Sequence, residues 1–394
     1  MSFSFNLARL PRILFGAGQR AHLPALVSHY GAQILIVTGG QSFLAGPHWP
    51  ALSQALTAQK ITFHVVQVSG EPTALFIDDT VDSYKDQRID CVLGIGGGSA
   101  LDAAKAIAGL LKSNHSVMDY LEGVGPELAY HGPATPFIAV PTTAGTGSEA
   151  TKNAVLSKHG SGGFKKSFRD DQLVADYAVI DPDLLASCPR EGMAANGMDA
   201  FTQLLESYVS SKANPFTDAL ALSGIEKVRD ALLQLYEGHG DASTHRAAMA
   251  YAALLSGITL AQVGLGSVHG LAAPLGAFFP IPHGVVCGTL VAAATQSNIH
   301  AMQARDAMNP ALAKYAQIGR LLTQRDLNDA AAQAALIDTL RLWTQRLQLP
   351  RLAFYGVTTD DIPRIVAHCR GSSMKTNPIE LSDAEIADLL LARL

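Results

Sequence analysis

The stretch CVLGIGGGSALDAAK, residues 91–105, runs from an apolar strand pattern through three consecutive glycines into a helical pattern. Glycine lets the backbone approach a ligand closely and adopt positive φ, and the free N–H groups at a helix start favour an anion. The pattern could therefore bind a dinucleotide pyrophosphate. It could also be an ordinary strand-to-helix turn with Ser99 as the N-cap residue. The glycine spacing differs from GxGxxG, so the usual dinucleotide fingerprint is not met.

Further strand patterns flank this turn, and the apolar runs are residues 33–38, 62–68, 91–95, 137–140 and 178–180. They lack strict alternation, which is typical of strands covered on both faces. Helical patterns lie between several of them, for example at 41–59 and 100–111. This alternation predicts an α/β domain with a doubly wound parallel sheet over residues 1–184.

The second half of the chain has a different pattern. Strand signals thin out after Asp181, and Ala- and Leu-rich helical runs dominate, at 215–236, 246–262, 329–345 and 383–394. A length of 394 residues suits two domains, so we expect an all-helical domain over residues 185–394. No Asp, Glu, Lys or Arg occurs between Arg246 and Arg305. Ser, Gln, His, Gly and Pro interrupt this run, so it predicts buried helices rather than a span of about 20 apolar residues.

The amino-acid composition excludes several classes of protein. Hydrophobic residues make up 48% and charged residues 16% of the chain, which excludes a disordered protein. The net charge of −5 offers no basic excess for nucleic acid. The four cysteines form no CxxC pair, and the N-terminus lacks the pattern of a signal peptide. We therefore expect a cytoplasmic protein that binds neither nucleic acid nor membrane.

A second polar turn, PTTAGTGSE at residues 141–149, follows the next predicted strand. Small hydroxyl residues among glycines could line the same crevice at the carboxyl ends of the strands. An ordinary loop, in which Ser and Thr side chains bond to the backbone of the turn, would show the same sequence pattern.

Polar residues of the helical half could meet at one site. Asp199 and Gln203 are four residues apart on a helical pattern and share a face. His269 and His283 lie in the stretch without charged residues. A buried carboxylate costs free energy unless it is paired or bound to a cation, so convergence of these groups would suit a divalent transition metal. Taken singly, the same residues also fit an ion-paired aspartate, a surface glutamine and core histidines bonded to backbone.

Four motifs together are specific: GGGSALDAAK (96–105), PTTAGTGSEAT (141–151), GMDAFTQLLESYVS (197–210) and VHGLAAPLGAFFPIPHG (268–284). On these motifs the chain resembles the iron-containing (group III) alcohol dehydrogenase family along essentially its whole length. The resemblance implies an α/β dinucleotide-binding domain, a helical domain, and an active site between them. It also implies a homodimer that interconverts a small alcohol and its aldehyde or ketone with NAD(P), by direct hydride transfer.

The resemblance assigns roles by position in the motifs. The residues expected to bind the cofactor are Gly97, Gly98, Ser99, Asp102, Thr142, Thr143, Thr146, Ser148 and Lys165. The residues expected to hold Fe²⁺ or Zn²⁺, and so to act in catalysis, are Asp199, His269 and His283. The metal would polarise the carbonyl in reduction and stabilise the alkoxide in oxidation.

The chain departs from the family at two positions, and a third position bears on the choice of cofactor. Gln203 stands where the family has its first histidine ligand, and an amide oxygen is the weaker ligand, so we expect Gln203 to complete the metal site at reduced affinity. Ala273 stands where the family often has a further histidine near the nicotinamide. Gly39 stands where NAD-preferring members often carry aspartate, and with Ser42 nearby to bond a 2′-phosphate this favours NADP.

Other functions also fit parts of the sequence. Gln203 is compatible with a metal-independent reductase resembling maleylacetate reductases. A lyase resembling dehydroquinate synthase would share the fold but would need basic residues, and Arg190 and Lys212 are among the few candidates. A relative that only binds nucleotide would keep the glycine turn without turnover.

Overall fold

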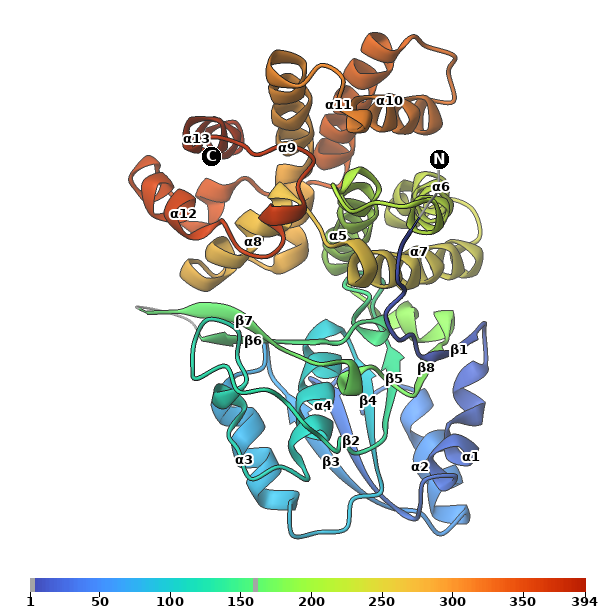
Figure 1. Cartoon of the computed structure of the whole chain (residues 1–394). Helices are drawn as coiled ribbons and strands as arrows, with labels where there is room; N and C mark the ends of the chain where they lie inside the picture. The colour runs from blue at the N-terminus through green and yellow to red at the C-terminus, as the bar shows by residue number, and fades with distance from the viewer. Residues whose placement is uncertain (1–3, 159–161) are drawn as a thin grey trace. The chain divides into compact units, whose positions relative to one another are not determined.

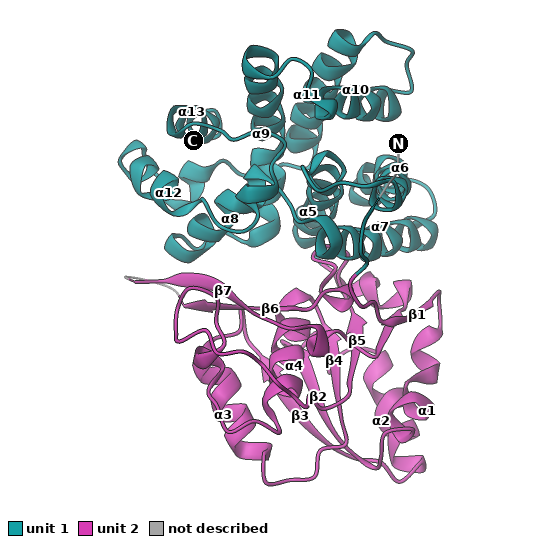
Figure 2. Ribbon diagram, viewed as in Figure 1, with its two compact units in different colours: residues 1–7, 159–161, 189–394 teal, residues 8–158, 162–188 magenta. Residues whose placement is uncertain are grey.

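The computed structural model describes residues 4–158 and 162–394, which form two compact units (Figure 2). The α/β unit comprises residues 8–158 and 162–188. The helical unit comprises residues 189–394 together with the described residues 4–7. The N-terminal segment belongs to the helical unit because Phe5 stacks on Phe216, with ring centroids 6.4 Å apart.

The described part of the α/β unit is built on a six-stranded sheet in which every neighbouring pair is parallel. In spatial order the strands are β1 (Arg12–Phe15), β8 (Tyr177–Ile180), β5 (Phe137–Pro141), β4 (Cys91–Gly96), β2 (Gln33–Gly39) and β3 (Thr62–Val68). The predicted parallel sheet is confirmed. The short edge strand β1 was not predicted.

Helices cover both faces of this sheet (Figure 1). On β2, Ile34 and Ile36 pack into the core beneath α1 (Leu23–Ser28) and α2 (His48–Ala58). Their neighbours Leu35 and Val37 pack into the opposite core beneath α3 (Ala74–Tyr84) and α4 (Gly98–Leu110). Successive side chains of a strand point to opposite faces, so a strand buried on both faces shows a continuous apolar run.

Two local predictions were wrong. The helix predicted from residue 41 begins only at His48, because a turn over 41–47 ends at Pro47, the N-cap residue. A hairpin was missed, in which β6 (Asn153–Lys158) pairs antiparallel with β7 (Phe164–Arg169).

The helical unit follows the predicted pattern. Its longer helices are α5 (Arg190–Val209), α6 (Pro215–Glu237), α7 (Ala242–Val263), α8 (Ser267–Phe278), α9 (His283–Arg305), α10 (Pro310–Thr323), α11 (Asp329–Arg346), α12 (Ile362–His368) and α13 (Asp383–Leu391). The stretch without charged residues forms most of α7, α8 and α9, which are largely buried. Among the described residues, only α7 has the length and composition of a possible membrane span, and 61% of its most apolar window is buried.

Candidate active site

The glycine turn lies where the sheet changes its direction of winding. Strands β3 and β4 flank β2 on opposite sides, and ligands of open α/β sheets bind at such a switch point. The ends of β2 and β4 come very close there. A Cβ added at Gly96 would lie 3.0 Å from the backbone nitrogen of Gly39.

The PTTAGTG loop packs directly onto the glycine turn. A Cβ at Gly97 would lie 3.2 Å from Thr143 Oγ1, and one at Gly98 would lie 2.7 Å from Thr146 Oγ1. Thr142, which precedes Thr143 in this loop, donates its backbone N–H to Gly96 O at 2.9 Å. The structure therefore brings the two predicted cofactor loops together, so closely that a Cβ at Gly98 would clash with Thr146 unless the loop shifted.

Helix α4 begins at Gly98, with Gly97 as its N-cap. The N-cap role considered for Ser99 is therefore wrong, and Ser99 lies in the first turn. No side chain caps this helix start among the described residues. Ala100 N already donates to Gly97 O at 3.0 Å, so the backbone N–H groups of Gly98 and Ser99 are the ones that could meet a ligand or water.

Asp102 faces the second loop. Its Oδ1 accepts a hydrogen bond from Ser148 Oγ at 2.5 Å, and its Oδ2 accepts one from Val155 N at 3.2 Å. The hydrogen bond between Asp102 and Ser148 therefore ties the loop to α4.

Lys105, which the sequence reading did not single out, is fully buried behind Asp102. Its Nζ donates to the Ser148 carbonyl at 2.9 Å, to Thr151 Oγ1 at 3.0 Å and to the Asn153 carbonyl at 2.6 Å. Burial lowers the pKa of Lys105 to about 8, so the side chain remains an ammonium at neutral pH. Lys105 therefore fastens residues 148–153 to α4.

Two other predicted cofactor residues lie apart from this network. Lys165, on β7, forms an ion pair with Glu71 and is only 12% exposed. Ser42 is exposed in the turn that follows β2. The role of each toward a cofactor stays a prediction.

The predicted metal ligands converge in the helical unit. Asp199 is on α5, His269 is in the first turn of α8, and His283 is the first residue of α9. Asp199 Oδ1 lies 3.3 Å from His269 Nε2 and 3.6 Å from His283 Nε2. Cys287, which the sequence reading missed as a site residue, joins them, and the ligand atoms of all four lie within 4.8 Å of one another.

Glycines bring α9 close to α5 at this point. A Cβ at Gly284 would lie 2.5 Å from the Ala195 carbonyl oxygen, and one at Gly288 would lie 2.8 Å from Met198 Cβ. The two glycines are four residues apart on α9 and thus share a face. Their lack of side chains lets α9 approach Asp199.

The centre favours positive charge. Burial opposes ionisation of Asp199, but His283 and His269 hold the pKa of this carboxyl below its usual range. Burial likewise acts against protonation of His269, but Cys287, Asp199 and Glu206 raise the pKa of the imidazole well above its usual range. Among the described residues, no lysine or arginine pairs with Asp199 or Glu206.

Glu206 fixes the orientation of His269. Its Oε1 accepts from the Val268 backbone N–H at 2.7 Å, and its Oε2 lies 2.6 Å from His269 Nδ1. An ionised carboxylate only accepts hydrogen bonds, so Nδ1 carries a proton, and Nε2 is the ring nitrogen that faces Asp199 and that would bind a cation once it has lost its own proton. This carboxylate–histidine pairing is typical of metal-bound imidazoles. For His269, the alternative of a core histidine bonded to backbone is wrong.

We predict that Glu206→Gln lowers metal affinity by about 10–100-fold, since a neutral amide orients the imidazole less firmly. A competition titration against a chromophoric chelator measures this change. The exposed Glu226 on α6 provides the control variant Glu226→Gln. Equal affinities in the two variants would show that Glu206 does not support the ligand.

Gln203 is buried, so the alternative of a surface glutamine is wrong. Its Nε2 donates to Asp199 Oδ1 at 3.0 Å, and its Oε1 accepts from Ser256 Oγ at 2.7 Å. Gln203 thus contacts the centre through its amide nitrogen.

The residues fit a divalent metal. Asp199 Oδ2 is buried, and no described residue donates a hydrogen bond to it. Imidazole nitrogen, carboxylate oxygen and thiolate sulfur are the donors that zinc takes in proteins. A cation at this point would supply the partner that Asp199 lacks.

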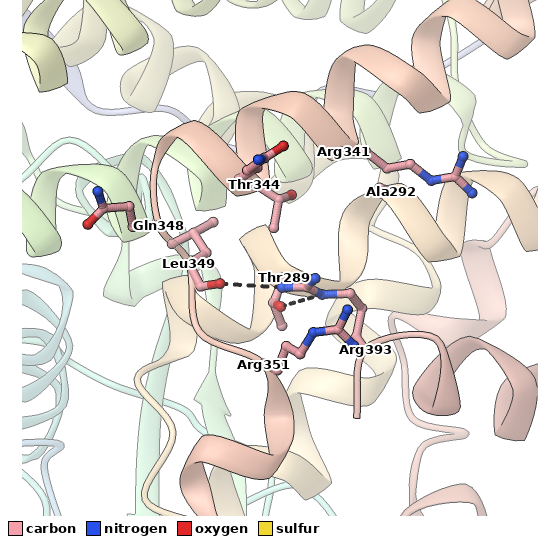
Figure 3. A pocket seen from close by; sticks show the side chains of 9 residues that line it. Thr289, Ala292, Arg341, Thr344, Gln348, Leu349, Arg351 and Arg393 are labelled. Atoms are coloured by element: carbon pink, nitrogen blue, oxygen red, sulfur yellow. Dashed lines mark hydrogen bonds between the residues drawn. The ribbon is translucent and has the colours of Figure 1, made fainter.

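A separate cavity lies elsewhere in the helical unit. It measures about 480 Å³ and shares no lining residue with the metal centre. Figure 3 shows Arg351 and Arg393 close together within it, with Arg341 at another part of its wall. Burial and the charge of Arg351 lower the pKa of Arg393.

Comparisons with known proteins agree along the whole chain. The family model described as iron-containing alcohol dehydrogenase matches residues 11–182, and the model of the C-terminal part of the Fe-containing alcohol dehydrogenase family matches residues 193–394. Alcohol dehydrogenase 4 of Schizosaccharomyces pombe is 32% identical over 95% of this chain and 85% of its own.

Solved structures match the fold as well. A structure of 1,3-propanediol oxidoreductase matches with a TM-score of 0.90 and 26% identity, over 100% of both chains. A sulfoacetaldehyde reductase from Bifidobacterium kashiwanohense in complex with NAD⁺ matches with a TM-score of 0.86 and 25% identity, over 100% of this chain and 99% of its own.

Proposed function

This chain belongs to the iron-containing alcohol dehydrogenase family, and from that premise we propose that Asp199, His269 and His283 hold its catalytic metal. The chain is an oxidoreductase acting on CH–OH groups, with NAD(P) and a divalent metal as cofactors. The observation that carries the proposal is the convergence of these side chains from three helices around a buried carboxylate oxygen without a partner.

When bound, the metal supplies Lewis acidity for a carbonyl or alkoxide oxygen, and the nicotinamide carries the hydride. The chain's own residues prepare the site for this chemistry. Asp199 brings a negative charge that neutralises part of the cation's charge. Glu206 holds His269 through its Nδ1, which leaves Nε2 as the ring nitrogen that would bind the metal. Position 273 is alanine, so no imidazole there carries a proton.

Chelation tests this function. Treatment with a chelator should abolish alcohol-dependent reduction of NAD(P)⁺, and Fe²⁺ or Zn²⁺ should restore it. Full activity after verified metal removal would favour the metal-independent reductase that Gln203 suggested. Substrate conversion without a net change in NAD(P)H absorbance would indicate a lyase. Of the two basic candidates for such a lyase, Arg190 has its guanidinium stacked 4.1 Å from the Tyr236 ring centroid.

For the cofactor we propose a preference for NADP(H), with Gly39 and Ser42 beside the adenosine ribose and Gly97, Gly98, Ser99 and the second loop at the phosphates. Gly39→Asp should lower the ratio of kcat/KM with NADPH to that with NADH by about tenfold or more. A carboxylate near a 2′-phosphate costs on the order of 1–4 kcal/mol. Gly40→Asp, one residue farther along the turn, is the control. An unchanged ratio in Gly39→Asp would place the 2′-phosphate elsewhere.

We also propose that the protein is a cytoplasmic homodimer that pairs through its N-terminal strand. Strand β1 lies at one edge of the sheet, and Ile13 and Phe15 on it are 40% and 37% exposed. Edge strands can pair with a second chain. Sedimentation velocity should give a dimer, with Ile13→Lys shifted toward monomer; a monomeric wild type would contradict the proposal.

A further inference from the structure

Cys287 occupies the position at the metal centre that a fourth ligand would fill. It lies four residues after His283 on α9, one turn along the same face. Its side chain is fully buried, and its Sγ is 3.6 Å from His269 Nε2 and 3.8 Å from His283 Nε2.

Four of the distances between these donor atoms match a single ion. Zinc binds nitrogen, oxygen and sulfur at about 2.0–2.3 Å, so the ligand atoms of a tetrahedral site lie about 3.3–3.8 Å apart. The distances from Asp199 Oδ1 to the two imidazole nitrogens are 3.3 and 3.6 Å. Those from Cys287 Sγ to the same nitrogens are 3.6 and 3.8 Å. Cys287 thus lies at a tetrahedral distance from both histidines.

Gln203 directs its ligating atom elsewhere. The only atom of a glutamine side chain that binds metal is Oε1, and here Oε1 accepts the hydrogen bond from Ser256 Oγ. The amide nitrogen, which cannot ligate a cation, points at Asp199. Gln203 is therefore placed to position the Asp199 carboxylate through a hydrogen bond.

We propose that Cys287 is the fourth metal ligand of this enzyme and that Gln203 is a positioning residue, so that the donor set is Asp–His–His–Cys. The inference rests on the proposed function, since it concerns the same ion. On binding, a sulfur–metal bond forms, the S–H bond breaks, and its proton leaves to solvent. A thiolate is a softer ligand than imidazole, so the set favours Zn²⁺ over Fe²⁺.

Cobalt substitution tests the proposal without relying on turnover. The full-length enzyme loaded with Co²⁺ should show near-ultraviolet thiolate-to-cobalt charge-transfer absorption. Cys287→Ser should lose this absorption. Gln203→Ala should retain it, as should Cys91→Ser, which replaces an equally buried cysteine of strand β4. Retention of the absorption in Cys287→Ser would show that the sulfur ligand is not Cys287 and would overturn the proposal.

X-ray absorption on the wild-type protein covers the case in which Cys287→Ser does not fold. The zinc-loaded protein should show one sulfur neighbour at about 2.3 Å. Metal bound with nitrogen and oxygen neighbours alone would overturn the role of Cys287 and leave the proposed function intact. Failure to bind any divalent metal, with or without turnover, would overturn both.

Discussion

Asp199→Asn is expected to lower kcat/KM for alcohol oxidation by at least about 1,000-fold, the equivalent of roughly 4 kcal/mol of transition-state stabilisation. The substitution keeps the shape of the side chain and the hydrogen bond from Gln203 but removes the negative charge. Without that charge, the proposed cation would lose the carboxylate oxygen that the four-residue centre offers it among the described residues. The protein should then no longer retain stoichiometric metal through gel filtration, as elemental analysis measures.

His283→Ala should have the same effect on metal content. His300→Ala serves as the control for both variants, because His300 lies on the same helix as His283 but is exposed. It should keep wild-type metal and turnover. Wild-type activity in Asp199→Asn would mean that catalysis does not pass through this centre.

Lys105→Met is expected to destabilise the protein by about 3–5 kcal/mol, because it removes the cation from a buried ionic network. The Asp102 carboxylate, 3.7 Å from Nζ, would lose its charge partner. The acceptors in residues 148–153 would lose their donor. The midpoint of thermal unfolding, followed by circular dichroism, should fall by on the order of 10 °C.

Lys112→Met is the matched control for this variant. Lys112 is exposed just beyond the end of α4, so its replacement should change stability by less than about 0.5 kcal/mol. Equal midpoints for the two variants would mean that the Lys105 network contributes nothing to stability. In Lys105→Met we also expect weaker cofactor binding, since the loop beside the glycine turn loses its attachment to α4.

The sheet was predictable because its strands are buried on both faces and therefore appear as continuous apolar runs. The close approach of Gly97 and Gly98 to the second loop was also foreshadowed, since the carboxyl ends of parallel strands meet at one edge of a sheet. The edge strand β1 escaped prediction for the opposite reason. It is only four residues long, and Ile13 and Phe15 on it are partly exposed.

The meeting of Asp199 with His269 and His283 could be suggested from burial cost, but its geometry could not. The residues lie on three helices, and their convergence depends on how closely Gly284 and Gly288 let α9 approach α5. Such long-range contacts leave no local periodicity.

Residues that act through a long-range partner were missed. Lys105 has the appearance of a surface lysine until its acceptors in residues 148–153 are seen. Glu206 is an ordinary helical glutamate in sequence, and Cys287 was read only as one of four separate cysteines. The spacing of four residues between His283 and Cys287, within a stretch without charged residues, is the signal that could have identified it.

Anomalous X-ray diffraction from crystals of the zinc-loaded protein, with data on both sides of the zinc absorption edge, tests the central claim most directly. We predict one strong anomalous peak per chain, within bonding distance of Asp199 Oδ, His269 Nε2 and His283 Nε2. A fully loaded, active crystal with no peak among these three side chains, or with its zinc peak elsewhere, would contradict the assignment of this centre.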